Sequence, residues 1–299
     1  MKPASFDYHR PDTIDDAVAL LSELGDDAKI IAGGQSLVPM LAMRLAYFDH
    51  LIDISRLGEL RGIERRGHEL WIGAGTTEAT VGADDQVRQA VPLLTRATPF
   101  VGHFQIRNRG TLGGSIAHAD AAGEYPAAAL ALDAVMEVLS PRGRREIAAA
   151  DFFAGLWETT MEPDEVLTGV RFPVWNGRSG FSVREFARRH GDFAIAGALV
   201  AVQLDDADRV SRCGIGLLGL GSTVRRAPAA EAAVVGMPVG ELVAEEIGRA
   251  AMTGLDDVPT DLQGSASYRT QVGATMVARA WREGVHEAID EAPAGAANA

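Results

Sequence analysis

Hydrophobic and polar positions near the start of the chain follow the spacing of a small α/β unit. Thr13 precedes an apolar run with helical spacing and, with an acidic residue three positions on, predicts a helix N-terminus. Strand-like, mostly apolar segments at 29–32 and 51–54 predict short buried strands, and apolar positions at helical spacing over 37–45 predict a second helix. Residues 1–57 are therefore expected to form one α/β lobe.

A second lobe is expected over residues 58–175 and a C-terminal α+β unit over 178–290. The second lobe has strand patterns at 70–74 and 135–139, a helix after Thr77, a helical turn at 92–97, a stretch rich in Gly, Ala, Ser and Thr at 108–126 and an apolar run at 127–132. The C-terminal unit has strand patterns at 182–187, 198–204 and 210–220, then helical patterns at 239–252 and 268–287. Pro, Asn and Gly at 173–180 predict the boundary, and the Ala/Pro/Gly-rich residues 291–299 predict a flexible tail.

The composition is that of a folded, acidic protein. Of 299 residues, 47% are hydrophobic and 23% charged, and 28 basic against 41 acidic side chains give a net charge of −13, which argues against nucleic-acid binding. Residues 1–11 lack the apolar core of a secretory signal, and the apolar run at 127–136 is broken by Asp133, so no membrane span is expected. The single cysteine, Cys213, excludes an intrachain disulfide and an iron–sulfur cluster held by this chain alone. These features predict a cytoplasmic protein.

A Gly-Gly segment, Ala-Gly-Gly-Gln-Ser at 32–36, lies between a strand pattern and a helical pattern. Adjacent glycines allow positive φ, so that successive backbone N–H groups converge on one point. Together with the N-terminus of the following helix, this pattern predicts an anion site suited to a pyrophosphate. A plain tight turn is the alternative interpretation of these residues alone.

A second Gly-Gly segment, Thr-Leu-Gly-Gly-Ser at 111–115, follows about 80 residues later. Two such segments with flanking hydroxyls are expected to hold one diphosphate from two sides. Asp120 or Glu124, just downstream, is expected to accept hydrogen bonds from ribose hydroxyls. Ordinary loop chemistry is again the alternative, although two such segments beside strand patterns are less often a coincidence.

A third glycine motif is interpreted differently. Gly-Ile-Gly-Leu-Leu-Gly at 214–219 matches the dinucleotide-binding pattern G-x-G-x-x-G letter for letter. That pattern binds a dinucleotide where a helix opens on the glycines within a βαβ unit, whereas here the run is itself strand-like and no helical pattern begins. We interpret it as a glycine-rich core strand.

The sequence contains few signals of a metal site or of a catalytic nucleophile. The seven histidines form no His-x-x-x-His pair, so no metal site is expected, and a Gly-x-Ser-x-Gly nucleophile motif is absent. Cys213 lies in an apolar strand pattern and is interpreted as a small buried hydrophobe. Arg184, Arg188, Arg189 and His190 form a basic cluster. It is either a solvated face or a counter-charge for a bound cofactor.

The two Gly-Gly segments, in this order and at this separation, resemble the paired FAD loops of the molybdenum hydroxylases. The chain most resembles the separate flavoprotein chain of that family, the medium subunit of aerobic carbon monoxide dehydrogenase and its relatives. The resemblance covers nearly the whole chain and continues through Phe-Asp-Tyr at 6–8, Pro-Met at 39–40, Leu-Ile-Asp at 51–53, Gln-Ile-Arg-Asn-Arg-Gly at 105–110, Gly-Asp-Phe-Ala at 191–194, Gly-Ser-Ala-Ser-Tyr-Arg at 264–269 and Ala-Arg-Ala at 278–280.

The resemblance implies an α+β fold, with a two-lobe FAD-binding domain of the vanillyl-alcohol-oxidase type followed by a small α+β C-terminal domain. It implies that loop amides hold the pyrophosphate, that Thr111 bonds a phosphate oxygen and that Glu124 takes the ribose position. It also implies that the Leu167 backbone meets the flavin pyrimidine edge and that Arg184 and Phe193 lie beside the ring. The implied FAD-binding residues are Ala32, Gly33, Gly34, Gln35, Ser36, Leu37, Val101, Thr111, Gly113, Gly114, Ser115, Asp120, Glu124, Leu167, Arg184 and Phe193. No catalytic side chain and no metal ligand are implied, because the flavin carries the chemistry.

Three positions depart from the family pattern. Ser115 replaces a frequent Asn, Ala121 stands where many relatives have Pro, and Phe193 lacks the hydroxyl of a frequent Tyr. None of these changes removes a phosphate contact. They are candidates for altering the flavin potential or the choice of electron acceptor.

The resemblance implies an oxidoreductase subunit that binds FAD and transfers electrons. The implied partners are a molybdenum-pterin large subunit and a small subunit with two [2Fe–2S] clusters, in a dimer of heterotrimers, with electrons passing from the clusters through FAD to an external acceptor. One alternative is a free-standing flavin oxidase or reductase acting directly on an organic substrate, for which the sequence offers no convincing proton acceptor. The other is an assembly protein whose loops no longer bind FAD, against which the intact double glycines argue.

Overall fold

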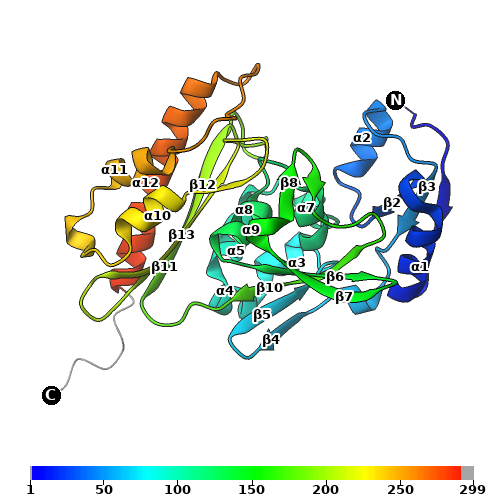
Figure 1. Cartoon of the computed structure of the whole chain (residues 1–299), viewed down its shortest axis with the longest axis horizontal. Helices are drawn as coiled ribbons and strands as arrows, with labels where there is room; N and C mark the ends of the chain where they lie inside the picture. Colours follow the sequence, from blue (N-terminus) through cyan, green and yellow to red (C-terminus); the bar gives the residue numbers. More distant parts are fainter. Residues whose placement is uncertain (1, 291–299) are drawn as a thin grey trace.

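The computed structural model describes residues 2–290, and over this range the chain folds around three main sheets with helices on their faces (Figure 1). The α+β class and the two-lobe FAD-binding architecture with a C-terminal domain are confirmed. The predicted flexible tail at 291–299 lies outside the described residues. No helix within 2–290 is both long and apolar enough to cross a bilayer.

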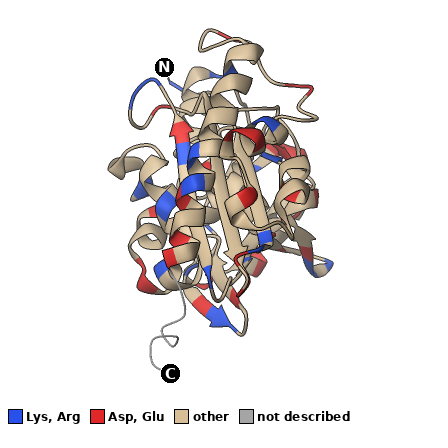
Figure 2. Cartoon of the chain, turned by 90° about the vertical axis from the view of Figure 1, so that its left-hand side faces the viewer, with Lys and Arg blue, Asp and Glu red and all other residues tan. Residues whose placement is uncertain are grey.

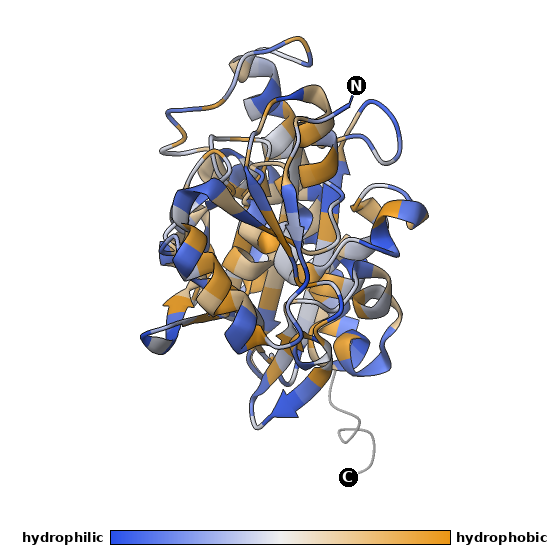
Figure 3. Cartoon of the chain, turned by 90° about the vertical axis from the view of Figure 1, so that its right-hand side faces the viewer, coloured by the Kyte–Doolittle hydropathy of each residue, from blue (hydrophilic) through white to orange (hydrophobic). Residues whose placement is uncertain are grey.

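The first sheet and its helices, here called lobe 1, lie at one end of the molecule (Figures 1 and 3). The sheet is parallel, in the order β1-β3-β2, with strands β1 (Asp7–His9), β2 (Ala28–Ile31) and β3 (His50–Asp53). Helix α1 (Ile14–Leu24) begins where predicted, because the Thr13 hydroxyl accepts a hydrogen bond from the Asp16 amide at 3.1 Å. The helix predicted at 37–45 is α2 (Leu37–Met43), so both helices and both strands predicted in this region are confirmed.

The second sheet carries most of the helices between lobe 1 and the C-terminal domain, and this part is called lobe 2. Its five antiparallel strands have the order β4-β5-β10-β6-β7. They are β4 (Ile63–Arg66), β5 (Glu69–Gly73), β6 (Val135–Ser140), β7 (Gly143–Ala148) and β10 (Val166–Pro173). The helices are α3 (Glu78–Ala83), α4 (Asp85–Ala90), α5 (Pro92–Ala97), α6 (Phe104–Arg107), α7 (Leu112–His118), α8 (Glu124–Ala131) and α9 (Ala149–Phe152), and β8 (Phe153–Gly155) pairs with β9 (Glu158–Thr159). Apolar side chains such as Ile72, Met136 and Val170 fill the core between sheet and helices.

The third sheet separates two cores. Its order is β11-β12-β13-β14, with β11 (Ser179–Phe186), β12 (Ala196–Leu204), β13 (Val210–Leu218) and β14 (Arg225–Arg226). Phe181, Leu199 and Leu218 point into the core of lobe 2, whereas residues such as Val200 and Ile215 pack under α10 (Pro228–Val234), α11 (Ala244–Ala251) and α12 (Ala266–Asp290). On the outer side of these helices, acidic and basic residues are interspersed (Figure 2).

One predicted helix of the C-terminal domain is interrupted. The pattern at 239–252 predicts a single helix, but the structure has a 3₁₀ turn at Val239–Glu241 and then α11 from Ala244. Leu242 and Val243 between them are extended, with ψ of 128° and 115°. Their apolar side chains fit the helical period, although the backbone leaves it.

The glycine motif at 214–219 lies in strand β13 and confirms the interpretation of a core strand. A Cβ at Gly214 or Gly216 would overlap backbone carbonyls of α8, at Ala131 and Ala127 respectively. These glycines therefore let α8 pack directly on the sheet. Cys213 beside them is a buried free thiol, and burial raises its pKa well above the usual value.

Candidate functional site

The first Gly-Gly segment forms the turn from β2 to α2. Gly34 has φ of +71°, a conformation that favours glycine, and the side-chain amide of Gln35 donates a hydrogen bond to the Gly33 carbonyl at 2.7 Å. Within residues 2–290, the backbone amides of residues 33–36 donate no hydrogen bond to another protein group. Four neighbouring donors without a protein partner are what a phosphate-binding turn offers.

The second Gly-Gly segment is not a loop but the first turn of α7. The Thr111 hydroxyl caps that helix by accepting the Gly114 amide at 3.0 Å. The amides of Leu112 and Gly113 donate to the carbonyls of Thr76 and Ala74, at 3.0 and 2.9 Å. Because these amides are engaged in the protein, the segment offers hydroxyl donors instead. The Thr111 proton and the half-buried Ser115 hydroxyl are the groups that a phosphate can use.

The structure brings the two segments together. A Cβ at Gly33 would lie well inside van der Waals contact of the Arg109 carbonyl and 2.8 Å from the Gly110 Cα, so lobe 1 meets lobe 2 backbone to backbone. A Cβ at Gly114 would meet only the Thr111 hydroxyl at 2.8 Å and the Ala32 Cβ at 3.8 Å. Gly114 therefore borders the space between the two segments, with lobe 1 on its other side.

The two carboxylates predicted for the ribose differ in their surroundings. Asp120 accepts hydrogen bonds from the Ala122 amide at 2.8 Å and from the Trp157 indole at 3.2 Å, so its oxygens are already used. His118 stacks on Trp157, and burial lowers the pKa of this histidine. The Glu124 side chain, at the start of α8, forms no hydrogen bond to another described side chain, and only its own backbone amide lowers its pKa against the effect of burial, so it is the freer acceptor.

The C-terminal domain contributes the loop between β11 and β12. A Cβ at Gly191 would lie 2.6 Å from the His103 ring, and the His103 and His190 rings meet edge to face with centroids 6.3 Å apart. This loop therefore lies against the segment that contains Val101. Phe193, in the same loop, is 67% exposed, so most of its aromatic ring is left uncovered by residues 2–290.

Arg184 lies on the other face of the third sheet. Its guanidinium pairs with Glu283 of α12, and the neighbouring Ser182 hydroxyl donates to the same carboxylate at 2.7 Å. Residues 181, 183 and 185 take the face toward lobe 2, so the sheet stands between the Arg184 guanidinium and that face. Leu167 is buried in β10, next to a bulge in its pairing with β6.

Sequence reasoning found Glu124 but missed Glu78 and Glu185, two further acidic residues with raised pKa at the boundary between lobe 2 and the C-terminal domain. Burial raises the pKa of Glu78 to about 8, of Glu124 to about 7 and of Glu185 to about 8. The charge of Glu124 adds to the shift at Glu78 and at Glu185, while Arg107 opposes it at Glu78. One oxygen each of Glu78 and Glu185 is buried without a hydrogen-bond partner in the described chain. The period-2 pattern of β11 was the available signal, because apolar residues at 181 and 183 place residue 185 on the same face.

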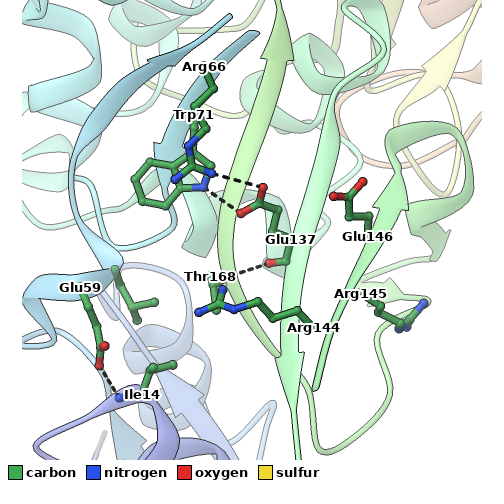
Figure 4. A pocket seen from close by; sticks show the side chains of 10 residues that line it. Ile14, Glu59, Arg66, Trp71, Glu137, Arg144, Arg145, Glu146 and Thr168 are labelled. Atoms are coloured by element: carbon green, nitrogen blue, oxygen red, sulfur yellow. Dashed lines mark hydrogen bonds and ion pairs between the residues drawn. The ribbon is translucent and has the colours of Figure 1, made fainter. Parts of the chain in front are cut away.

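A cavity of about 520 Å³ elsewhere is a different feature (Figure 4). It lies on the outer face of the lobe 2 sheet, where Trp71 donates to Glu137 at 3.0 Å and Arg66 stacks on the indole at 4.4 Å from the ring centroid. Neighbouring side chains along the same strands, Ile72 and Met136, point the other way, into the core. Among residues 2–290 no group of three His, Cys, Asp or Glu side chains is arranged to hold a metal ion.

Comparison with known proteins identifies matching families over both parts of the chain. Residues 4–175 match the family described as FAD binding domain in molybdopterin dehydrogenase, and residues 181–284 match the CO dehydrogenase flavoprotein C-terminal domain. The chain is 43% identical to the alpha subunit of the 6-hydroxypseudooxynicotine dehydrogenase complex of Paenarthrobacter nicotinovorans, covering 96% of this chain and 97% of that one. It is 37% identical to the carbon monoxide dehydrogenase medium chain of Hydrogenophaga pseudoflava, covering 94% and 97%. A solved structure of the carbon monoxide dehydrogenase from Hydrogenophaga pseudoflava superposes with a TM-score of 0.93 at 38% identity, covering 96% of this chain and 99% of the matched chain.

Proposed function

This chain belongs to the FAD-binding subunits of the molybdenum hydroxylases, and from that premise we propose that it relays electrons from [2Fe–2S] clusters of a partner subunit through FAD to an external acceptor. The proposed assembly is a dimer of heterotrimers with a molybdenum-pterin large subunit and an iron–sulfur small subunit. The observation that carries the proposal is the set of amides at residues 33–36 without protein partners, in a segment that contacts the second Gly-Gly segment where the two lobes meet.

The residues fit FAD in a consistent arrangement. The amides of Gly33, Gly34 and Gln35 and the hydroxyls of Thr111 and Ser115 would hold the pyrophosphate. Glu124 would accept from a ribose hydroxyl, Leu37 and Val101 would border the cofactor, and Phe193 would cover an apolar face of the ring.

FAD, when bound, supplies the electron chemistry, because it accepts electrons singly and delivers them in pairs. The protein binds it, orients it and sets the charge around it. The net charge of the pyrophosphate explains why the first segment carries unpaired amides and no carboxylate.

Replacing Gly114 by Val tests the cofactor site. The branched side chain would fill the space beside Ala32 and displace the Thr111 hydroxyl, so we expect the variant to purify without flavin, with at least a hundredfold loss of FAD affinity. Flavin absorption of the purified chain and titration of the released apoprotein with FAD measure this loss. The matched control is Gly240→Val, since a Cβ at Gly240 meets nothing within 4 Å. Full flavin in Gly114→Val would contradict the assignment of the second segment.

The electron route has its own test. Anaerobic addition of candidate substrates, carbon monoxide and N-heterocycles among them, is expected to bleach the flavin only when the partner subunits are present. Bleaching of the isolated FAD-loaded chain by an organic substrate would favour a free-standing oxidase or reductase instead.

A further inference from the structure

The motif Gly-Ser-Ala-Ser-Tyr-Arg at 264–269, which the FAD-binding residues above do not include, ends in a buried arginine. Ser265 precedes α12 and its hydroxyl accepts the Tyr268 amide at 3.2 Å, so Arg269 lies in the first turn of that helix. Arg269 is only 3% exposed, whereas arginine is mostly found at protein surfaces. The groups that this buried guanidinium contacts therefore indicate what it does.

The Arg269 guanidinium joins three segments of the C-terminal domain. Its Nη2 donates to both carboxylate oxygens of Asp261, at 2.8 and 2.7 Å. Its Nη1 donates to the backbone carbonyls of Ile195 and Gly219, at 2.6 and 3.3 Å. A planar guanidinium is suited to this position, because it offers several donors in a rigid fork. One side chain therefore fixes two backbone segments relative to a carboxylate.

The Ile195 carbonyl lies at the end of the β11–β12 loop, which carries Phe193. The Ile195 amide donates to the Phe186 carbonyl at 2.8 Å and closes the base of this loop. Further along, the loop lies against lobe 2, where a Cβ at Gly191 would be 2.6 Å from the His103 ring. Phe193 is therefore held between two anchored positions, each two residues away from it.

The Gly219 carbonyl connects the same guanidinium to the junction with lobe 2. Gly219 has φ of +72°, and a Cβ there would lie 2.7 Å from the Ile195 carbonyl oxygen, so this close approach requires glycine. The Gly219 amide donates to the Ala121 carbonyl at 2.8 Å, three residues before Glu124. Arg269 therefore fixes the β11–β12 loop relative to the part of lobe 2 that leads into α8.

Net stability is a weak reason for burying this ion pair. Taking a guanidinium out of water offsets much of its attraction to the carboxylate, so well-packed apolar residues often stabilise a site as well. The Arg269 Nε is also buried without a hydrogen-bond partner among residues 2–290, which adds to the cost. What the guanidinium provides beyond stability is a defined position of the loop.

We propose that Arg269 is a positioning residue, which holds the β11–β12 loop so that the Phe193 ring covers the flavin. This inference rests on the proposed function, in which Phe193 lies over an apolar face of the ring. The role is steric and not electrostatic, because the charge of Arg269 is compensated by Asp261 at 2.7 Å.

Iodide quenching of flavin fluorescence, measured on the FAD-loaded chain after removal of free FAD, tests this role. Arg269→Lys keeps the charge but offers a single nitrogen, which cannot bond both carbonyls and the carboxylate together. We expect the quenching constant to rise about twofold, because an aromatic ring over one face shields about half of the flavin from collisions. Phe193→Ala is expected to give a similar rise. The double variant should show no more than Phe193→Ala alone, since both changes act through one contact.

Arg226→Lys is the matched control. Arg226 also donates to a backbone carbonyl, that of Leu130 at 2.9 Å, and to a carboxylate, that of Glu231 at 2.8 Å. None of its hydrogen bonds or ion pairs within residues 2–290 reaches the β11–β12 loop. This variant is therefore expected to lose stability without a change in quenching. An unchanged constant in Arg269→Lys, or additive effects in the double variant, would overturn the proposal.

Asp261→Asn covers the case in which Arg269→Lys fails to fold. The Asp261 side chain is 48% exposed, so Asn fits there and only weakens the grip on the guanidinium. We expect a smaller rise in quenching, and no rise would overturn the proposal. FAD content is measured first in every sample. A chain that binds no FAD would refute the proposed function together with this role, whereas full FAD, a normal response to Phe193→Ala and none to Arg269→Lys would refute only the role of Arg269.

Discussion

The two Gly-Gly segments share their letters but not their structure. At residues 33–36 the glycines make an open turn with positive φ at Gly34 and amides without protein partners. At residues 111–115 they make the first turn of a helix, whose amides are bonded to Thr111, Thr76 and Ala74. The first segment is therefore suited to bind with its backbone amides, and the second is suited to bind with hydroxyls.

The difference shows that the glycines of the two segments have three different physical roles. Gly34 provides a backbone conformation, Gly33 and Gly113 provide close packing, and Gly114 leaves a surface flat. A Cβ at Gly113 would overlap Ala74 at the end of β5, so this glycine fixes α7 to the sheet. Only the roles of Gly34 and Gly114 relate directly to the proposed cofactor site.

The largest expected effect comes from adding a side chain at Gly33, where the backbones of the two lobes are in contact. Gly33→Ala places a methyl group against the Arg109 carbonyl, which is backbone and cannot move aside. We expect a loss of unfolding free energy of about 4 kcal/mol, since overpacking against backbone is at the upper end of such costs. Urea unfolding of the FAD-free chain measures it, with Gly58→Ala as the control because a Cβ at Gly58 meets nothing within 4 Å. A loss below 1 kcal/mol would mean that the lobes are not held at Gly33.

A smaller expected effect is a pH dependence of stability, which arises from the buried Glu78 next to the second Gly-Gly segment only. Glu78 is 4% exposed, and a Cβ at Gly110, just before the second segment, would lie 2.6 Å from its carboxylate. Burial first, and then the charge of Glu124, raises the pKa of Glu78 from 4.5 to about 8. The unfolded chain releases this proton near pH 4.5 and the folded chain only near pH 8. The stability that the protonated carboxyl provides is therefore complete below pH 4.5 and is lost as the pH rises to 8.

Between pH 5 and pH 8.5 we expect the wild type to lose on the order of 3 kcal/mol more stability than Glu78→Gln, because the raised pKa values of Glu124 and Glu185 contribute to the pH dependence of both proteins. Urea unfolding at both pH values measures the difference, with Glu246→Gln as an exposed control. If the free energy of unfolding of the wild type and of Glu78→Gln changes equally with pH, the Glu78 carboxyl is not held protonated next to the second segment.

Much of the fold could be predicted from the sequence because local signals and packing agree. Thr13 caps α1 as predicted, and the strand-like segments at 29–32 and 51–54 form strands of lobe 1. The glycines of β13 were correctly assigned to a core strand, since no helical pattern follows them. The interrupted helix before α11 was missed, because apolar spacing reports which side chains are buried and not whether Leu242 and Val243 keep helical dihedrals.

The candidate site was predictable only where short motifs carry it. Both Gly-Gly segments were found, but their different use of amides depends on tertiary bonds such as that from Gly113 to Ala74. Arg184 was selected for its charge and position, whereas strand register turns it to Glu283 and turns Glu185 toward lobe 2. The pKa of Glu185 follows from burial between two domains, which no local pattern encodes.

The smallest expected effect tests whether the second segment binds through its hydroxyl. Thr111→Val removes both the cap of the Gly114 amide and the proton proposed for a phosphate oxygen. Thr77→Val is the matched control, because Thr77 caps α3 in the same way, accepting the Thr80 amide at 3.2 Å. Both variants are expected to lose about 1 kcal/mol of stability, the typical cost of an N-cap. Only Thr111→Val should also weaken FAD binding, by about tenfold, the equivalent of one further hydrogen bond to a charged group. Equal FAD affinities in the two variants, measured by flavin fluorescence, would assign Thr111 to helix capping alone and leave the pyrophosphate to the open amides of the first segment.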